Sequence, residues 1–160
     1  MKHKKIVSFG DLLYQIDKSN LVFTNGCFDM FHAGHAHLLS SIKQLTPKDS
    51  RLIVAVNSDK SVRSNKGSSR PIIPEAHRAY LVACHESVDQ VFIFDESSVE
   101  THLRLLKPKF WCKGGDYDLS SLNSLEKDAA KETKVLFIPL LKGLSSTNII
   151  NKIKNEKIHH

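Results

Sequence analysis

The sequence has 160 residues, of which 41% are hydrophobic and 25% charged, and its formal net charge is +6. This length and composition suit one globular domain, residues 1–160, with a core large enough to need no disulfide or metal. No apolar run approaches the roughly 20 residues of a membrane span, and no apolar core follows the basic N-terminus. We therefore expect a cytoplasmic protein with no membrane partner.

The basic residues are scattered, apart from short clusters at the two ends of the chain. A modest positive charge suits nucleic acid or small polyanionic ligands equally well. Aromatic residues make up only 8%, without a stacking or recognition-helix pattern, which argues against nucleic acid. The three cysteines are widely spaced and form no Cys-x-x-Cys pair, which argues against both a disulfide framework and a thiolate zinc knuckle.

Short apolar runs alternate with helical patterns along the chain. A helix over residues 9–16, capped by Ser8, lies in an N-terminal segment of about residues 8–18. The predicted strands are 21–24, 52–56, 91–94, 110–112 and 135–138. The predicted helices between and after them are 34–45, 75–85, 99–106, 124–131 and 146–154. The polar stretch 57–74 is the longest irregular segment, and long loops in compact domains are often functional.

This alternation predicts parallel strands joined by right-handed crossovers. The expected fold is α/β, a Rossmann-like open parallel five-stranded sheet with helices on both faces. Its core spans about residues 21–154, and residues 155–160 form a tail. Ligands of such sheets bind beyond the carboxyl ends of the strands. Unusual residues follow four of the five strands, and we expect these four loops to meet in one site.

The first of these loops runs from Thr24 and Asn25 through Cys27 and Phe28 to His32-Ala33-Gly34-His35. Gly34 stands at the start of a predicted helix, where free N–H groups and the helix dipole attract phosphate. The two imidazoles would add donors to the same anion and stabilise charge during a displacement. Two alternatives stay open: a purely structural histidine pair, and a zinc site formed by Cys27, His32, His35 and His37.

The other three loops have both a functional and an ordinary interpretation. Arg63, Lys66 and Arg70 lie in a stretch that could clamp phosphates or could be a solvated surface loop. Lys113-Gly114-Gly115-Asp116 could hold a base, a ribose or a magnesium ion, or could be a plain glycine turn. Ser145-Ser146-Thr147 could bind phosphate at a helix start or could only cap that helix.

No activated nucleophile is visible in the sequence. There is no Gly-x-Ser-x-Gly elbow, no Walker A sequence and no Gly-x-Gly-x-x-Gly. The sequence therefore predicts direct transfer without a covalent enzyme intermediate. Such chemistry depends mainly on positioning and charge neutralisation.

Together these residues resemble the His-x-Gly-His nucleotidyltransferase superfamily, which includes the cytidylyltransferases. More closely, they resemble the bacterial D-glycero-β-D-manno-heptose 1-phosphate adenylyltransferases. The closer resemblance covers about residues 21–154. It rests on five motifs: Phe23-Thr24-Asn25-Gly26-Cys27-Phe28-Asp29, Val56-Asn57-Ser58-Asp59, Lys66-Gly67 with Arg70-Pro71, Lys113-Gly114-Gly115-Asp116-Tyr117, and Ser146-Thr147-Asn148-Ile149-Ile150.

The resemblance implies that ATP and heptose 1-phosphate give ADP-heptose and pyrophosphate, with Mg²⁺ bound mainly through the nucleotide phosphates. The product would feed lipopolysaccharide inner-core synthesis. It also implies a homodimer or larger homo-oligomer. Because the sequence contains no kinase pattern, we expect a stand-alone enzyme that depends on a separate heptose kinase.

The resemblance also implies roles for individual residues. The catalytic residues would be His32, His35 and Lys66. Substrate-binding roles fall to Asp29, Asn57, Arg63 and Arg70, with Asp29 also ordering the first loop. Asp116 could contact magnesium. The nucleotide-binding residues would be Thr24, Asn25, Cys27, Phe28, Gly34, Lys113, Gly114, Asp116, Ser145, Ser146 and Thr147.

The sequence departs from the family pattern at a few positions. Met30-Phe31 is bulkier than the usual Leu-Leu pair, which could reshape the sugar pocket, and Ser145-Ser146-Thr147 replaces the common Ser-Thr-Thr. Two other functions stay open: a cytidylyltransferase for glycerol 3-phosphate or a similar alcohol phosphate, and a nucleotide-binding module without turnover. The full set of histidines, Lys66 and hydroxyl residues favours turnover, because binding alone would not need it.

Overall fold

The computed structural model describes residues 3–115, 120, 122–139, 141 and 143–156. Its centre is a parallel sheet of five strands in the order β3-β2-β1-β4-β5. The strands are β1 (Leu21–Gly26), β2 (Arg51–Asn57), β3 (Gln90–Phe94), β4 (Phe110–Gly114) and β5 (Lys134–Ile138).

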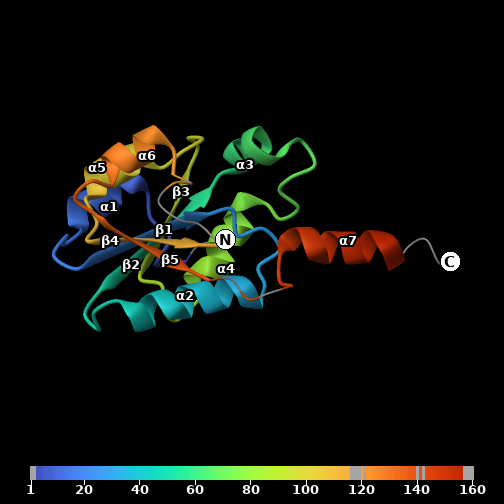
Figure 1. Ribbon diagram of the computed structural model, residues 1–160, viewed down its shortest axis with the longest axis horizontal. Coiled ribbons are helices and arrows are strands. Elements are labelled where there is room, and N and C mark those ends of the chain that lie inside the picture. Colours follow the sequence, from blue (N-terminus) through green and yellow to red (C-terminus); the bar gives the residue numbers. More distant parts are fainter. Residues whose placement is uncertain (1–2, 116–119, 121, 140, 142, 157–160) are drawn as a thin grey trace.

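Helices cover both faces of this sheet, with α2 and α4 on one face and α1, α5 and α6 on the other (Figure 1). The helices are α1 (Phe9–Gln15), α2 (Ala33–Leu45), α3 (Asp59–Lys66), α4 (Glu75–Ala83), α5 (Glu100–Leu106), α6 (Ser124–Ala129) and α7 (Ser146–Glu156). The predicted Rossmann-like fold is confirmed. In the described part of the chain, no helix is long and apolar enough to cross a membrane.

The central strands are apolar on both sides because each side contacts a different helix layer. In β2, Leu52, Val54 and Val56 face the layer of α2 and α4. Ile53 and Ala55, between them, face the layer of α1, α5 and α6. This period of two is the geometry of a strand, and it explains why a parallel strand reads as a continuous apolar run.

The strand order places a switch point between β1 and β4. The chain builds β1, β2 and β3 outward in one direction and then crosses over to add β4 and β5 on the other side of β1. α2, which follows β1, packs on one face of the sheet, and α6, which follows β4, packs on the other. In open α/β sheets, ligands bind at such a switch point, beyond the carboxyl ends of the strands. At this same end, α2, α3 and α7 begin (Figure 1).

The structure corrects the sequence prediction at one element and several boundaries. Residues 57–74 are not wholly irregular, because α3 occupies Asp59–Lys66. The side chain of Ser58 accepts a hydrogen bond from Ser61 N and starts this helix, which is polar on all but one narrow side. β4 continues through Lys113 and Gly114, and α7 reaches Glu156, so a tail from residue 155 was wrong.

Candidate active site

A cavity of about 540 Å³ lies at the carboxyl end of the sheet. It is lined by residues of the β1–α2 loop, α3, the segment after α3 and the start of α7. The lining residues are Cys27, Phe28, Asp29, His32, Gly34, His35, Val62, Lys66, Arg70, Leu144, Ser145, Ser146 and Thr147. Three of the four predicted loops thus meet in one place.

The two histidines are part of the first turn of α2. His32 is its N-cap, and its Nδ1 accepts a hydrogen bond from Gly34 N at 3.1 Å. His35 reaches back, and its Nδ1 accepts from His32 N at 3.3 Å. The rings stack with centroids 3.9 Å apart. The His-x-Gly-His spacing therefore forms a capping box, a reciprocal pair of side-chain bonds that satisfies free N–H groups at a helix start.

These backbone bonds decide which ring nitrogen carries the proton. A nitrogen that accepts an N–H bond has no hydrogen of its own, so Nδ1 of each ring is unprotonated. Each neutral ring then carries its hydrogen on Nε2. Both residues line the cavity, so the pair can offer two N–H donors to an anion there without carrying charge.

Burial keeps both imidazoles neutral. Desolvation lowers the pKa of His32 below its ordinary value. It lowers the pKa of His35 from 6.5 to about 4, helped by repulsion from His32 when that ring is protonated and from the Lys66 ammonium, and opposed by Asp29. Phe28 and Phe31 contribute to this burial, because their rings lie 5.3 and 5.5 Å from the His35 ring. At neutral pH the pair is thus a set of donors, not a pair of acids.

Two cations face the histidines from outside the β1–α2 loop. Lys66 is the last residue of α3 and is exposed at the cavity. Arg70 lies beyond it, with its guanidinium 3.3 Å from Asp29 and its second nitrogen 3.5 Å from the Thr147 hydroxyl. The cavity therefore combines positive charge with neutral donors, which suits a ligand with several phosphates.

Asp29 is buried and organises the loops rather than facing open space. Its carboxylate accepts hydrogen bonds from Ile72 N and Ile73 N and pairs with Arg70. Burial alone would raise the pKa of Asp29, but these partners outweigh it and hold the pKa below its ordinary value. The loop-ordering role predicted for Asp29 matches this geometry, and a direct substrate contact stays a prediction.

The start of α7 forms another wall of the cavity, beside the β1–α2 loop and α3. The Ser145 hydroxyl accepts from Asn148 N, as a helix cap does. The Ser146 hydroxyl donates to Asp29 O and so fastens α7 to the β1–α2 loop. Thr147 and Leu144 complete this wall. The hydroxyl residues are therefore both caps and cavity-lining groups.

Several predicted ligand residues do not line this cavity. The Thr24 hydroxyl is buried and donates to Cys112 O, and Asn25 accepts from the Trp111 indole. Asn57 is buried and donates to the Ser61 hydroxyl. Arg63 is exposed on α3 and is not among the cavity-lining residues.

Lys113 and Gly114, which begin the predicted β4 loop, are not among the cavity-lining residues. Lys113 pairs with Glu126 at 3.5 Å and lies over the Trp111 ring, and Gly114 belongs to β4. Asp116, with its predicted ribose or magnesium contact, lies outside the described residues. The nucleotide contacts predicted for Lys113, Gly114 and Asp116 stay predictions.

Sequence reasoning missed two groups of residues. Val62 and Leu144 line the cavity, but ordinary apolar residues give no signal of such a position. Arg78 is a wholly buried arginine beneath the site. It shares one face of α4 with buried Ala79, Val82 and Ala83, and a charged residue in an apolar helical stripe could have revealed it.

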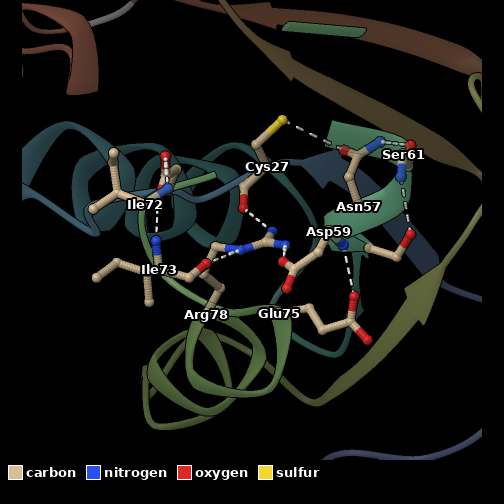
Figure 2. A network of polar contacts seen from close by, with 10 residues as sticks. Cys27, Asn57, Asp59, Ser61, Ile72, Ile73, Glu75 and Arg78 are labelled. Carbon is tan, nitrogen blue, oxygen red and sulfur yellow. Dashed lines mark hydrogen bonds and ion pairs between the residues drawn. The ribbon is translucent and has the colours of Figure 1, made fainter. Parts of the chain in front are cut away.

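The zinc alternative finds little support in this geometry. Within the described ranges, no three His, Cys, Asp or Glu side chains are grouped to hold a metal ion. His37 is exposed and contacts Ser41, on another side of α2. The Cys27 thiol points toward Asn57, 4.0 Å away (Figure 2).

A parallel α/β sheet with paired donors, cations and helix N-termini at its switch point defines a nucleotide-binding protein of the nucleotidyltransferase class. Comparison with known proteins agrees. The family model "Cytidylyltransferase-like" matches residues 23–152, and the chain belongs to this family.

The chain is 41% identical over 153 residues to the bifunctional protein HldE of Campylobacter fetus. It is 41% identical over 154 residues to the protein of the same name in Helicobacter pylori. These alignments cover 94% and 95% of this chain but 32% of each relative, so the chain spans about a third of the length of the relatives it matches.

Among solved structures, the lipopolysaccharide core biosynthesis protein of Thermoplasma volcanium is similar, with a TM-score of 0.63 and 26% identity. The match covers 76% of this chain and 98% of that protein. The prediction of a nucleotidyltransferase enzyme is confirmed at the level of the family.

The first prediction concerns the charge of His35. Titration followed by NMR of the ring Cε1–H should give His35 a pKa of about 4. The unfolded chain takes up this proton near pH 6.5, so the free energy of unfolding should fall as pH decreases from about 6.5 to about 4. His35→Ala should flatten this slope in urea denaturation. A measured His35 pKa near 6.5 would contradict the burial argument.

The second prediction concerns the space at Gly34. A Cβ there would lie 2.9 Å from Cε1 and 3.0 Å from Nδ1 of His32, so Gly34→Ala must displace that ring. Because alanine suits a helix better than glycine, the melting temperature should change little. Affinity for Mg·ATP, measured by calorimetry, should fall by about tenfold or more, as expected for loss of donors to a charged group.

Gly10→Ala is the matched control for this experiment. Gly10 is also the second residue of its helix, α1, and a Cβ added there would meet only Ser8 Oγ, at 3.9 Å. It should leave both ATP affinity and stability near the wild-type values. Equal ATP affinity in the two variants would show that the Gly34 contact has no role in binding.

Proposed function

We propose that this chain transfers the adenylyl group of ATP to D-glycero-β-D-manno-heptose 1-phosphate, giving ADP-heptose and pyrophosphate. The observation that carries the proposal is the histidine pair at a helix N-terminus, whose Nδ1 atoms accept backbone hydrogen bonds and which Lys66 and Arg70 face across the cavity. These bonds leave the two Nε2–H groups as the donors. This arrangement matches a reaction that moves negative charge between phosphates without proton transfer.

In the proposed reaction, a phosphate oxygen of the sugar phosphate attacks the α-phosphorus of ATP. A new P–O bond forms as the bond to the bridging oxygen of the β-phosphate breaks, and pyrophosphate leaves with that electron pair. Charge rises on the oxygens around the α-phosphorus, where His32 and His35 would donate hydrogen bonds. Donors fixed in advance stabilise such charge without reorganisation.

The attacking phosphate is already an anion, so the step needs no general base. This agrees with the site, because His35 has its Nδ1 engaged by the backbone and its pKa lowered to about 4. Lys66 and the hydroxyl residues at the start of α7 line the same cavity and would receive the charge of the pyrophosphate.

Magnesium would enter with the nucleotide. Among the cavity-lining residues that the structure describes, Asp29 is the only carboxylate, and Arg70 and two backbone N–H groups engage it. These residues fit a metal held mainly by the phosphates rather than by a protein cage. Bound Mg²⁺ would neutralise phosphate charge and orient the triphosphate.

The choice of heptose 1-phosphate rests on the sequence motifs together with the relatives. The similarity to two bifunctional HldE proteins and to a lipopolysaccharide core biosynthesis protein supports a role in lipopolysaccharide inner-core synthesis. The homo-oligomer and the separate heptose kinase stay predictions.

A second candidate is cytidylyl transfer to glycerol 3-phosphate or a similar alcohol phosphate. The description of the matched family, cytidylyltransferase-like, favours it. The histidines, Lys66 and the hydroxyl residues of the cavity would bind the triphosphate of ATP or of CTP equally well. The discriminating contacts would come from the β4 loop, around Lys113 and Gly114.

The third prediction tests the substrates. Pyrophosphate release should occur with ATP, heptose 1-phosphate and Mg²⁺, and not when CTP replaces ATP or when EDTA removes the metal. The experiment screens four nucleoside triphosphates against several sugar and alcohol phosphates in a coupled pyrophosphate assay. Turnover with CTP and glycerol 3-phosphate instead would establish the second candidate and reject the first.

The fourth prediction tests the histidines. His35→Ala should lower kcat by about a hundredfold or more, as for loss of a charge-stabilising donor, while the protein stays folded. His37→Ala is the control, because His37 is an exposed histidine on the same helix that contacts Ser41. Steady-state kinetics and circular dichroism of both variants give the result. Wild-type kcat in His35→Ala would remove this residue from the mechanism.

A further inference from the structure

Arg78, on α4, is wholly buried and does not line the cavity. Its Nε donates to Ile73 O at 2.8 Å, and its two terminal nitrogens donate to Cys27 O at 2.5 Å and to the Asp59 carboxylate at 2.7 Å. Figure 2 shows the guanidinium in the middle of these acceptors. The planar fork of arginine can serve several acceptors in fixed directions, which a lysine cannot do.

Each acceptor belongs to a different segment of the site. Cys27 opens the loop that leads to His32 and His35. Asp59 is the first residue of α3, the helix that ends at Lys66. Ile73 lies in the segment after Arg70. Arg78 thus bonds directly to the segments that carry the histidines and the lysine, and to the segment that follows the second cation, Arg70.

The β1–α2 loop, which leads to the histidines, has a backbone conformation that surrounding contacts must stabilise. Phe28 and Met30, which follow Cys27, have φ values of 51° and 53°. Residues with a side chain disfavour this left-handed region, so surrounding contacts must maintain it. The bond from Arg78 to Cys27 O fixes the peptide immediately before Phe28.

Two contacts attach the start of α3 to α4, and both involve Asp59. The Asp59 carboxylate pairs with Arg78, while Asp59 N donates to the Glu75 carboxylate at 2.6 Å. Glu75 is the first residue of α4, the same helix that carries Arg78. The start of α3 is therefore anchored to α4 by side chain and backbone together (Figure 2).

We propose that Arg78 is a positioning residue that sets the distance between the histidine pair and Lys66 by holding the β1–α2 loop, α3 and the segment 71–74 to one buried guanidinium. It would act on the reaction without touching either substrate. The inference rests on the proposed function for its kinetic consequence, while the positioning itself concerns only this chain.

Arg78→Lys tests the proposal, because lysine keeps the charge but cannot reach all three acceptors. We expect kcat to fall by about 10- to 100-fold, since small misplacements around reacting groups have effects of this size. Affinity for Mg·ATP should change much less. The NMR-measured pKa of His35 should rise from about 4, because the loosened loop admits water and Lys66 moves.

A purely stabilising role would give a different result, and Leu103→Ala provides the comparison. Leu103 is fully buried in the core on the face of the sheet opposite α4, and it does not line the cavity. This variant should lose stability through a cavity yet keep wild-type kcat per folded molecule and an unchanged His35 pKa. If Arg78→Lys behaves like Leu103→Ala in both readouts, the proposal is wrong.

A second variant covers the case in which Arg78→Lys does not fold. Asp59→Asn keeps an oxygen acceptor but removes the charge that pairs with Arg78. It should lower kcat and raise the His35 pKa in the same direction, by a smaller amount. Wild-type values of both in folded Asp59→Asn would overturn the proposal.

The two proposals can fail separately. If the wild-type chain releases no pyrophosphate with any substrate pair, the proposed function fails. The His35 titration in wild-type, Arg78→Lys and Asp59→Asn then still decides the positioning role, because it needs no turnover.

Discussion

The capping box at the start of α2 is the interaction on which the site depends. A helix start leaves N–H groups without partners, and here the two imidazoles accept from Gly34 N and His32 N. The same two bonds fix the tautomer of both rings and place each hydrogen on Nε2. One local solution to a folding problem therefore supplies two oriented donors, and Gly34 leaves room for the His32 ring beside the backbone.

The second constraint is charge. Lys66 and Arg70 make the cavity attractive to phosphates. If His32 and His35 were also positively charged, they would repel Lys66, Arg70 and each other. Burial beneath Phe28 and Phe31 prevents this by keeping His35 neutral, so the apolar residues of the loop have an electrostatic consequence. The cost is a loss of stability in acid, where the unfolded chain is protonated first.

Much of this architecture could be predicted from the sequence. Continuous apolar runs such as Leu52–Val56 identify parallel strands, and the loops after them identify the sheet edge that binds ligand. α3 escaped prediction because its residues are mostly polar, and Ser58, Glu75 and the buried side of Val62 define it only in three dimensions. Thr24, Asn25 and Asn57 follow or end strands like ligand residues, but their partners are other parts of the sheet and loops.

Arg78 shows why a site cannot be read from its motifs alone. Its acceptors are two backbone carbonyls and a carboxylate on segments that the sequence separates by up to 51 positions. The sequence of α4 does not indicate which residues these acceptors are. Burying an unpaired arginine would cost so much free energy that some acceptors must exist. Removing one partner would leave the guanidinium buried with fewer acceptors. The loops of the site are thus bound to a charge that the interior tolerates only while all three segments stay in place.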